Sequence, residues 1–160
     1  DEDIRWSRRA YFANVGYLDD EIAELMTALA AMRVDENTVI LSCSDHGDML
    51  GERDLWFKMS FFEGATRVPL MMRIPDQSPC NVATPFSTID VMPTVAALAA
   101  ADLDEIQPWT DVKSLLPLLD NAASAAPGLM EYAAKGSIVP LVAVGDGDFK
   151  FIHCPADPPQ

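Results

Sequence analysis

A short apolar run that leads into charged side chains is the feature that most constrains the fold of this chain. Residues 38–43 read Thr-Val-Ile-Leu-Ser-Cys, and Ser44 joins them to Asp45, His46 and Gly47. An uncharged run of this length predicts a strand covered on both faces of an α/β sheet. In α/β proteins, ligands bind where parallel strands leave the sheet. We therefore expect Asp45 and His46 at a functional site.

The two side chains suit a metal ion. Asp45 offers an oxygen donor and His46 a nitrogen donor to one divalent cation. Gly47 is expected to allow the backbone dihedrals that turn both side chains toward one point. The same residue types also occur in ordinary turns after strands. Spacing alone leaves a metal site and a solvated turn both open.

Hydrophobic periodicity predicts the surrounding elements. Apolar residues at three- and four-residue steps predict a helix from about Ile4 to Met32. The further elements are, in order, a loop over 45–64 whose aromatic side chains pack back onto the domain, a strand over 67–75, a helix over 87–101, a short helix or turn over 114–119, and a β-hairpin with strands 138–144 and 148–152. This order predicts one α/β domain over residues 1–160.

The charge balance limits the partners. The chain has 11 Lys and Arg against 25 Asp and Glu, a net charge of −14, which argues against nucleic acid or an anionic membrane as partner. An anionic substrate would need local positive charge, which Lys58 and Arg53 could supply. No apolar run is long enough to span a bilayer. Three cysteines at no metal-like spacing indicate a reducing, cytoplasmic compartment, with Cys43 as a small core residue.

The stretch from Ser44 to Gly64, SDHGDMLGERDLWFKMSFFEG, closely resembles the metal loop of sulfatases in the alkaline phosphatase superfamily. Within that family it is most similar to the choline-sulfatase branch. Two further stretches, residues 8–20 and 149–157, resemble the same family. The resemblance implies an alkaline phosphatase-like α/β sandwich, here incomplete, with residues 1–160 as the C-terminal part of the catalytic domain.

The resemblance also implies roles for individual residues. Asp45 and His46 would bind one divalent metal ion, calcium in the first place, with manganese or magnesium as alternatives. Lys58 would be a catalytic residue that contacts the sulfate oxygens, although it could also be a surface lysine. Glu52 and Arg53 are expected to hold the loop through ion pairs.

A second segment bears on the substrate. Residues 131–136 resemble the family segment whose Glu lies at the choline pocket, so Glu131 is predicted to bind substrate, with a plain surface acid as the alternative. A quaternary ammonium cannot donate a classical hydrogen bond and is held by aromatic faces and carboxylates. Lys135 stands where the family segment would have an acid, which changes the expected detail of that pocket.

The chain departs from the family at the nucleophile. Family members use a formylglycine made from Cys in a Cys-x-Pro-Ser-Arg motif and an adjacent pair of metal-binding Asp residues, and neither is found here. The chain alone is therefore expected to be inactive. Complete, the protein would be a homo-oligomeric hydrolase converting choline-O-sulfate to choline and sulfate. The alternatives are another metal-dependent phosphonate, phosphodiester or aryl sulfate hydrolase, or a non-catalytic truncated chain with a binding role.

Overall fold

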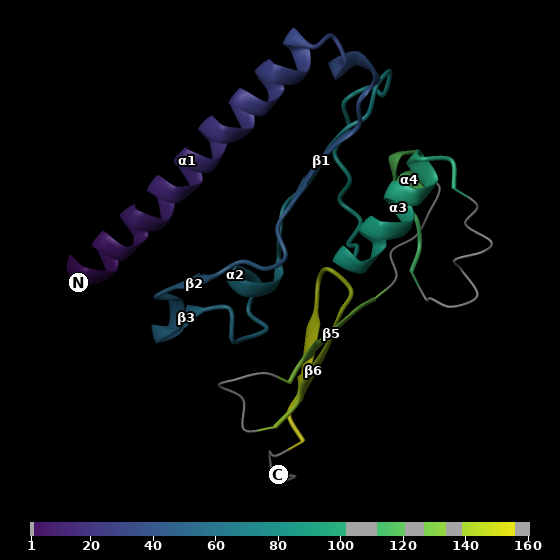
Figure 1. Cartoon of the computed structure of the whole chain (residues 1–160). Helices are drawn as coiled ribbons and strands as arrows, with labels where there is room; N and C mark the ends of the chain where they lie inside the picture. The colour runs from purple at the N-terminus through teal and green to yellow at the C-terminus, as the bar shows by residue number, and fades with distance from the viewer. Residues whose placement is uncertain (1, 102–111, 121–126, 134–138, 156–160) are drawn as a thin grey trace. The chain divides into compact units, whose positions relative to one another are not determined.

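The computed structural model describes residues 2–101, 112–120, 127–133 and 139–155 (Figure 1). The chain divides into two compact units, Asp1–Ser78 and Pro79–Gln160. The first unit contains the long N-terminal helix and the Asp45-His46-Gly47 turn. The second contains a three-stranded sheet. A single domain over residues 1–160 stays a prediction.

The N-terminal helix of the first unit is long and lies mostly in the open. Helix α1 spans Glu2–Ala31, which confirms the predicted helix. It ends where Arg33 adopts a left-handed φ of 57°, and the short 3-10 helix η1, Asp35–Asn37, follows. No residue of α1 is fully buried. No helix among the described residues combines the length and the apolar character that a membrane crossing requires.

The apolar run forms β1, Ile40–Cys43, which pairs with β4, Leu70–Arg73. The pairing is antiparallel, with Ile40 opposite Arg73 and Cys43 opposite Leu70. Both predicted strands are confirmed. The expected cover on both faces is wrong for the described part of the chain, because no residue of β1 is fully buried. Cys43 is accordingly exposed and is not a core residue.

The predicted loop after β1 contains a small hairpin. Strands β2, Met49–Leu50, and β3, Trp56–Phe57, pair antiparallel around the 3-10 turn η2, Glu52–Asp54, and α2, Glu63–Thr66, follows. The predicted packing of the aromatic side chains is confirmed for Phe61, which is buried with Met49 and Ala65. It is wrong for Phe57, which is 65% exposed.

The helices of the second unit meet at a buried threonine. The 3-10 turn η3, Thr88–Asp90, opens into α3, Val91–Leu98, through a capping box between Ser87 and Asp90. Thr94 Oγ1 donates to the Asp90 carbonyl at 2.6 Å and accepts the Leu115 N–H at 2.8 Å. This second bond ties α3 to the residue preceding α4, Leu116–Leu119. Both predicted helices are confirmed, with shorter spans.

The second unit also holds an antiparallel sheet of order β5-β6-β7, formed by Gly128–Tyr132, Leu141–Gly145 and Lys150–His153. The predicted hairpin is confirmed as β6 and β7. Asp146 Oδ1 accepts the N–H groups of Asp148 and Phe149 at 3.1 and 2.8 Å, and Gly147 has a φ of 101° that favours glycine. Strand β5 was not predicted.

Candidate functional site

The turn after β1 is held by backbone contacts with α2. Ser44 Oγ donates to the His46 carbonyl at 2.6 Å, and the Gly47 N–H donates to the Ala65 carbonyl at 2.9 Å. A Cβ atom at Gly47 would lie 2.2 Å from the Gly64 carbonyl oxygen. Gly47 does not adopt a left-handed φ. Close approach of two backbone segments therefore explains this glycine, and the expected reliance on unusual dihedrals is wrong.

Asp45 and His46 lie side by side at this turn. Asp45 Oδ2 is 3.4 Å from His46 Nε2, and Asp45 Oδ1 accepts the His46 N–H at 2.9 Å. His46 Nδ1 lies 2.9 Å from the Gly47 carbonyl oxygen. A carbonyl can only accept, so Nδ1 carries the proton and Nε2 presents its lone pair. Asp45 is mostly exposed and His46 about one-third exposed.

Lys58 joins this pair from the far end of the hairpin. Its Nζ lies 2.6 Å from His46 Nε2, at hydrogen-bond distance. The ammonium donates and the imidazole nitrogen accepts, which agrees with a proton on Nδ1. The structure therefore brings together three of the four residues that the sequence singled out. Their catalytic and metal-binding roles stay predictions.

The donor set fits part of a metal site. Two ligands at about 2.0–2.5 Å from one cation are typically roughly 3 Å apart, and the Asp45 oxygen and His46 nitrogen are 3.4 Å apart. The Gly47 carbonyl orients the imidazole as outer partners of metal-ligating histidines do. Among residues 2–101 and the other described ranges, no three His, Cys, Asp or Glu side chains gather to hold a metal ion. Asp45 and His46 could thus supply two ligands of a metal site.

Glu131, the fourth predicted residue, lies in the second unit. It is on β5, with its side chain on the exposed face that also carries Leu129. Across the sheet it is opposite Val142, which in turn is opposite His153. Lys135 lies outside the described residues. The carboxylate is thus open to a cationic ligand, while its role in substrate binding stays a prediction.

The loop is fastened to α1 by an arginine that the sequence analysis missed. Arg8 Nε donates to the Leu50 carbonyl at 2.8 Å, and its terminal nitrogen pairs with Glu52 at 2.9 Å. Glu52 also accepts the Leu50 N–H at 2.6 Å. The expected ion pair of Glu52 is confirmed. Arg53 instead lies over the Phe62 ring, 4.6 Å from its centroid.

These contacts stabilise the charged form of Glu52. The backbone N–H of Leu50, then that of Glu52 itself, and then the Arg8 guanidinium lower the pKa of the Glu52 carboxyl from its ordinary value of 4.5. Arg8 opens the stretch 8–20 that resembles the sulfatase family, which was the available signal. Its partners lie more than 40 residues away along the chain, so the sequence did not indicate what it binds.

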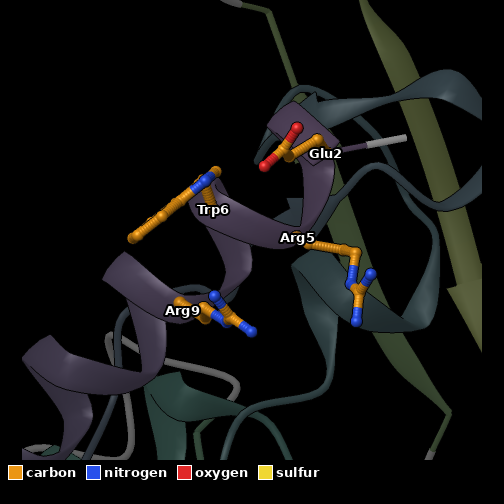
Figure 2. Close-up of a pocket in the computed structure, with 4 residues that line it drawn as sticks. All are labelled: Glu2, Arg5, Trp6 and Arg9. Atoms are coloured by element: carbon orange, nitrogen blue, oxygen red, sulfur yellow. The ribbon is translucent and has the colours of Figure 1, made fainter.

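A separate feature of the first unit is a hollow on α1. It has a volume of about 290 Å³ and is lined by Glu2, Arg5, Trp6 and Arg9 (Figure 2). The Arg9 guanidinium lies 5.3 Å from the centre of the Trp6 ring. All four side chains come from the first turns of one helix. The hollow includes none of the four predicted site residues.

Comparison with known sequences identifies the family. Residues 3–101 match the Sulfatase family model. The chain is 52% identical, along all 160 residues, to a choline-sulfatase of Rhizobium meliloti (strain 1021), and it spans 31% of that protein. It is 46% identical over 71 residues, 44% of the chain, to the iduronate 2-sulfatase of Mus musculus, of which it spans 13%. The chain thus covers less than a third of the length of these relatives.

Solved structures agree with this result. The phosphonate monoester hydrolase of Silicibacter pomeroyi matches with a TM-score of 0.74 and 25% identity, over 88% of this chain and 31% of that one. A protein solved in complex with its substrate D-glucosamine-2-N,6-O-disulfate matches with a TM-score of 0.73 and 26% identity, over 94% of this chain and 32% of that one. The predicted alkaline phosphatase-like α/β class is confirmed as a partial fold. The match of residues 3–101 to the family model, together with these relatives and solved structures, shows that the chain belongs to the sulfatase family.

Proposed function

We propose that this chain is part of a metal-dependent sulfuric ester hydrolase that converts choline-O-sulfate to choline and sulfate. The observation that carries the proposal is the 52% identity to a choline-sulfatase along all 160 residues. The cluster of Asp45, His46 and Lys58 supports it, because it combines two metal donors with a cation. Sulfate ester cleavage needs such charge, since negative charge develops on the ester oxygens.

Asp45 and His46 would hold a divalent cation, with the Gly47 carbonyl keeping the His46 lone pair on Nε2. When bound, the cation would polarise the sulfuryl oxygens. Nε2 has a single lone pair, so its hydrogen bond from Lys58 and a bond to a cation exclude one another. Lys58 would then direct its N–H donors to the ester oxygens. We propose calcium, with manganese and magnesium as alternatives, as the resemblance to sulfatases implies; the Asp45 carboxylate is a hard oxygen ligand that suits all three.

The nucleophile is proposed to lie outside this segment. None of Cys43, Cys80 and Cys154 begins a Cys-x-Pro-Ser-Arg motif. A formylglycine would therefore come from another part of the protein, and the 160-residue chain alone would not turn over sulfate esters. Glu131 would bind the choline ammonium through its exposed carboxylate.

A chimera tests the proposal directly. The 160 residues replace the matching 31% of the R. meliloti choline-sulfatase, and sulfate release from choline-O-sulfate is compared with hydrolysis of an aryl phosphonate. We expect a preference for choline-O-sulfate. A preference for the phosphonate would favour the function named for the S. pomeroyi structural neighbour. Loss of both activities, with the chimera folded, would favour a non-catalytic role.

The metal-site proposal needs its own variants. Asp45→Ala and His46→Ala in the chimera should lower bound metal and remove nearly all activity, and metal content is measured by elemental analysis. Re-addition of calcium, manganese or magnesium to the metal-free chimera identifies the ion. Unchanged metal content in both variants would overturn the ligand assignment. The native mass of the chimera tests the expected homo-oligomer.

A further inference from the structure

The distance between His46 and Lys58 depends on one small hairpin. His46 lies three residues before β2, and Lys58 directly follows β3. The two strands pair at two positions, with Met49 opposite Phe57 and Leu50 opposite Trp56. Whatever stabilises this hairpin therefore stabilises the contact of 2.6 Å between the two side chains.

The backbone of the hairpin is strained, and its strands are too short to be stable by themselves. Arg53, Asp54 and Phe57 have left-handed φ values of 56°, 58° and 66°. Such a conformation costs roughly 1–2 kcal/mol for each residue that is not glycine. An isolated two-stranded hairpin is marginal in water even with longer strands. Strain of this kind persists only where surrounding contacts impose it.

Those contacts come from the first turns of α1, which lie beside the hairpin (Figure 1). Arg8 binds the Leu50 carbonyl with Nε and the Glu52 carboxylate with its terminal nitrogen. The second Glu52 oxygen accepts the Leu50 N–H. The Leu50 carbonyl is thereby bonded from α1, and the Leu50 N–H is bonded by the turn of the hairpin, whose Glu52 is in turn held by Arg8. A guanidinium can do this because it presents several N–H groups in a rigid fork.

Apolar packing supports the same position. An ideal Cβ atom at Gly51, whose φ is 94°, would lie 3.2 Å from the Trp56 ring and 3.4 Å from Ile4 of α1. The glycine therefore lets the Trp56 ring and the helix close over the turn. The hairpin is therefore held to α1 in two ways: by the hydrogen bonds of Arg8 and by apolar packing at Ile4.

We propose that Arg8 and Glu52 are positioning residues that hold the hairpin from which Lys58 reaches the Asp45-His46 turn, without touching the substrate. The inference deepens the proposed function and rests on it. Arg8 anchors the turn, the β2–β3 pairing transmits that position, and Lys58 emerges at the end of the pairing. When a cation occupies His46 Nε2, the ammonium would be released from that nitrogen and could turn to the ester oxygens.

The test uses the chimera with Arg8→Gln and the matched control Arg9→Gln, whose guanidinium lies over Trp6 on the same helix. We expect Arg8→Gln to lower kcat by about tenfold to a hundredfold with a small change in KM, since small misplacement costs this much. Arg8→Lys should restore only part of kcat, because lysine lacks the fork. Arg9→Gln should leave both constants within about twofold.

A double-mutant cycle separates positioning from general damage. In a Lys58→Ala background, Arg8→Gln should lower kcat by less than about twofold, because the ammonium that Arg8 positions is gone. An equal loss of kcat in both backgrounds would overturn the proposal. No loss of kcat when Lys58 is present would also overturn it. The cycle can be run with whichever ester the chimera hydrolyses, so a wrong substrate assignment does not affect it.

A measurement without activity completes the test. Amide hydrogen exchange over residues 49–58 should be at least tenfold faster in Arg8→Gln than in Arg9→Gln. If the chimera hydrolyses no ester, the proposed function fails and this readout still decides whether Arg8 holds the hairpin. Equal exchange in the two variants would overturn that anchoring role.

Discussion

Replacement of Gly47 by alanine tests the geometry of the Asp45-His46 turn. The new Cβ would lie 2.2 Å from the Gly64 carbonyl oxygen, and real Cβ contacts essentially never fall under 3.0 Å. The two backbone segments must therefore separate by about 0.8 Å, the difference between these distances. Forced overpacking costs about 1–3 kcal/mol. Weakening of the Gly47 N–H bond to the Ala65 carbonyl adds about 1 kcal/mol.

The expected effect on function is larger than that on stability. A displacement of this size beside reacting groups costs about a hundredfold in rate. Gly47 directly follows His46, the proposed metal ligand, so the substitution would displace it. We expect Gly47→Ala in the chimera to lower the free energy of unfolding by about 2–4 kcal/mol and kcat/KM by about a hundredfold. Urea denaturation and sulfate release measure the two effects.

Gly16→Ala is the matched control for the glycine substitution. A Cβ at this position of α1 meets no atom within 4 Å. Alanine in a helix interior is about 0.5–1 kcal/mol more favourable than glycine, so this variant should be slightly more stable and fully active. Wild-type activity and stability in Gly47→Ala would refute the argument from close approach.

Three further predictions concern other contacts. Thr94→Val should destabilise the chimera by about 1–3 kcal/mol in urea denaturation, because it leaves the buried Leu115 N–H without its acceptor. Glu131→Gln should raise KM for choline-O-sulfate severalfold and leave KM for an aryl sulfate without a cationic group unchanged; equal changes would argue against a choline contact. Because the pKa of Glu52 is lowered, its bond network contributes stability above pH 4.5 that is lost as the pH falls below that value. The protection of residues 49–58 from amide exchange, corrected for the pH dependence of intrinsic exchange, should therefore fall below pH 4.5 in the wild type and much less in Glu52→Gln.

Local sequence signals predicted most of the regular elements. The spacing of apolar residues along residues 4–32 predicted α1, and the Ser87–Asp90 signal predicted the start of α3. Turn residues around Asp146 predicted the β6–β7 hairpin. These elements depend on contacts within a few residues, so a local pattern suffices. Strands β2 and β3 have two residues each and were missed, because so short a strand has no detectable period.

The burial of β1 shows the limit of such patterns. Its apolar residues predicted cover on both faces, yet in the described part of the chain no residue of β1 is fully buried and Cys43 is exposed. The composition of a strand indicates whether its faces could be buried. Whether they are buried depends on which other elements of the folded chain pack against them.

By itself, the sequence determined the family and nominated Asp45, His46 and Lys58, because these residues belong to one specific local stretch. Only the tertiary structure decided that the Lys58 ammonium reaches His46 Nε2 and that the Gly64 carbonyl requires a glycine at position 47. It also decided that Arg8 binds the Leu50 carbonyl in the hairpin that leads to Lys58. The physical reason is distance along the chain. Bonds such as the one from Arg8 to Leu50 join residues 42 positions apart, and no local pattern encodes a contact that exists only once the chain has folded.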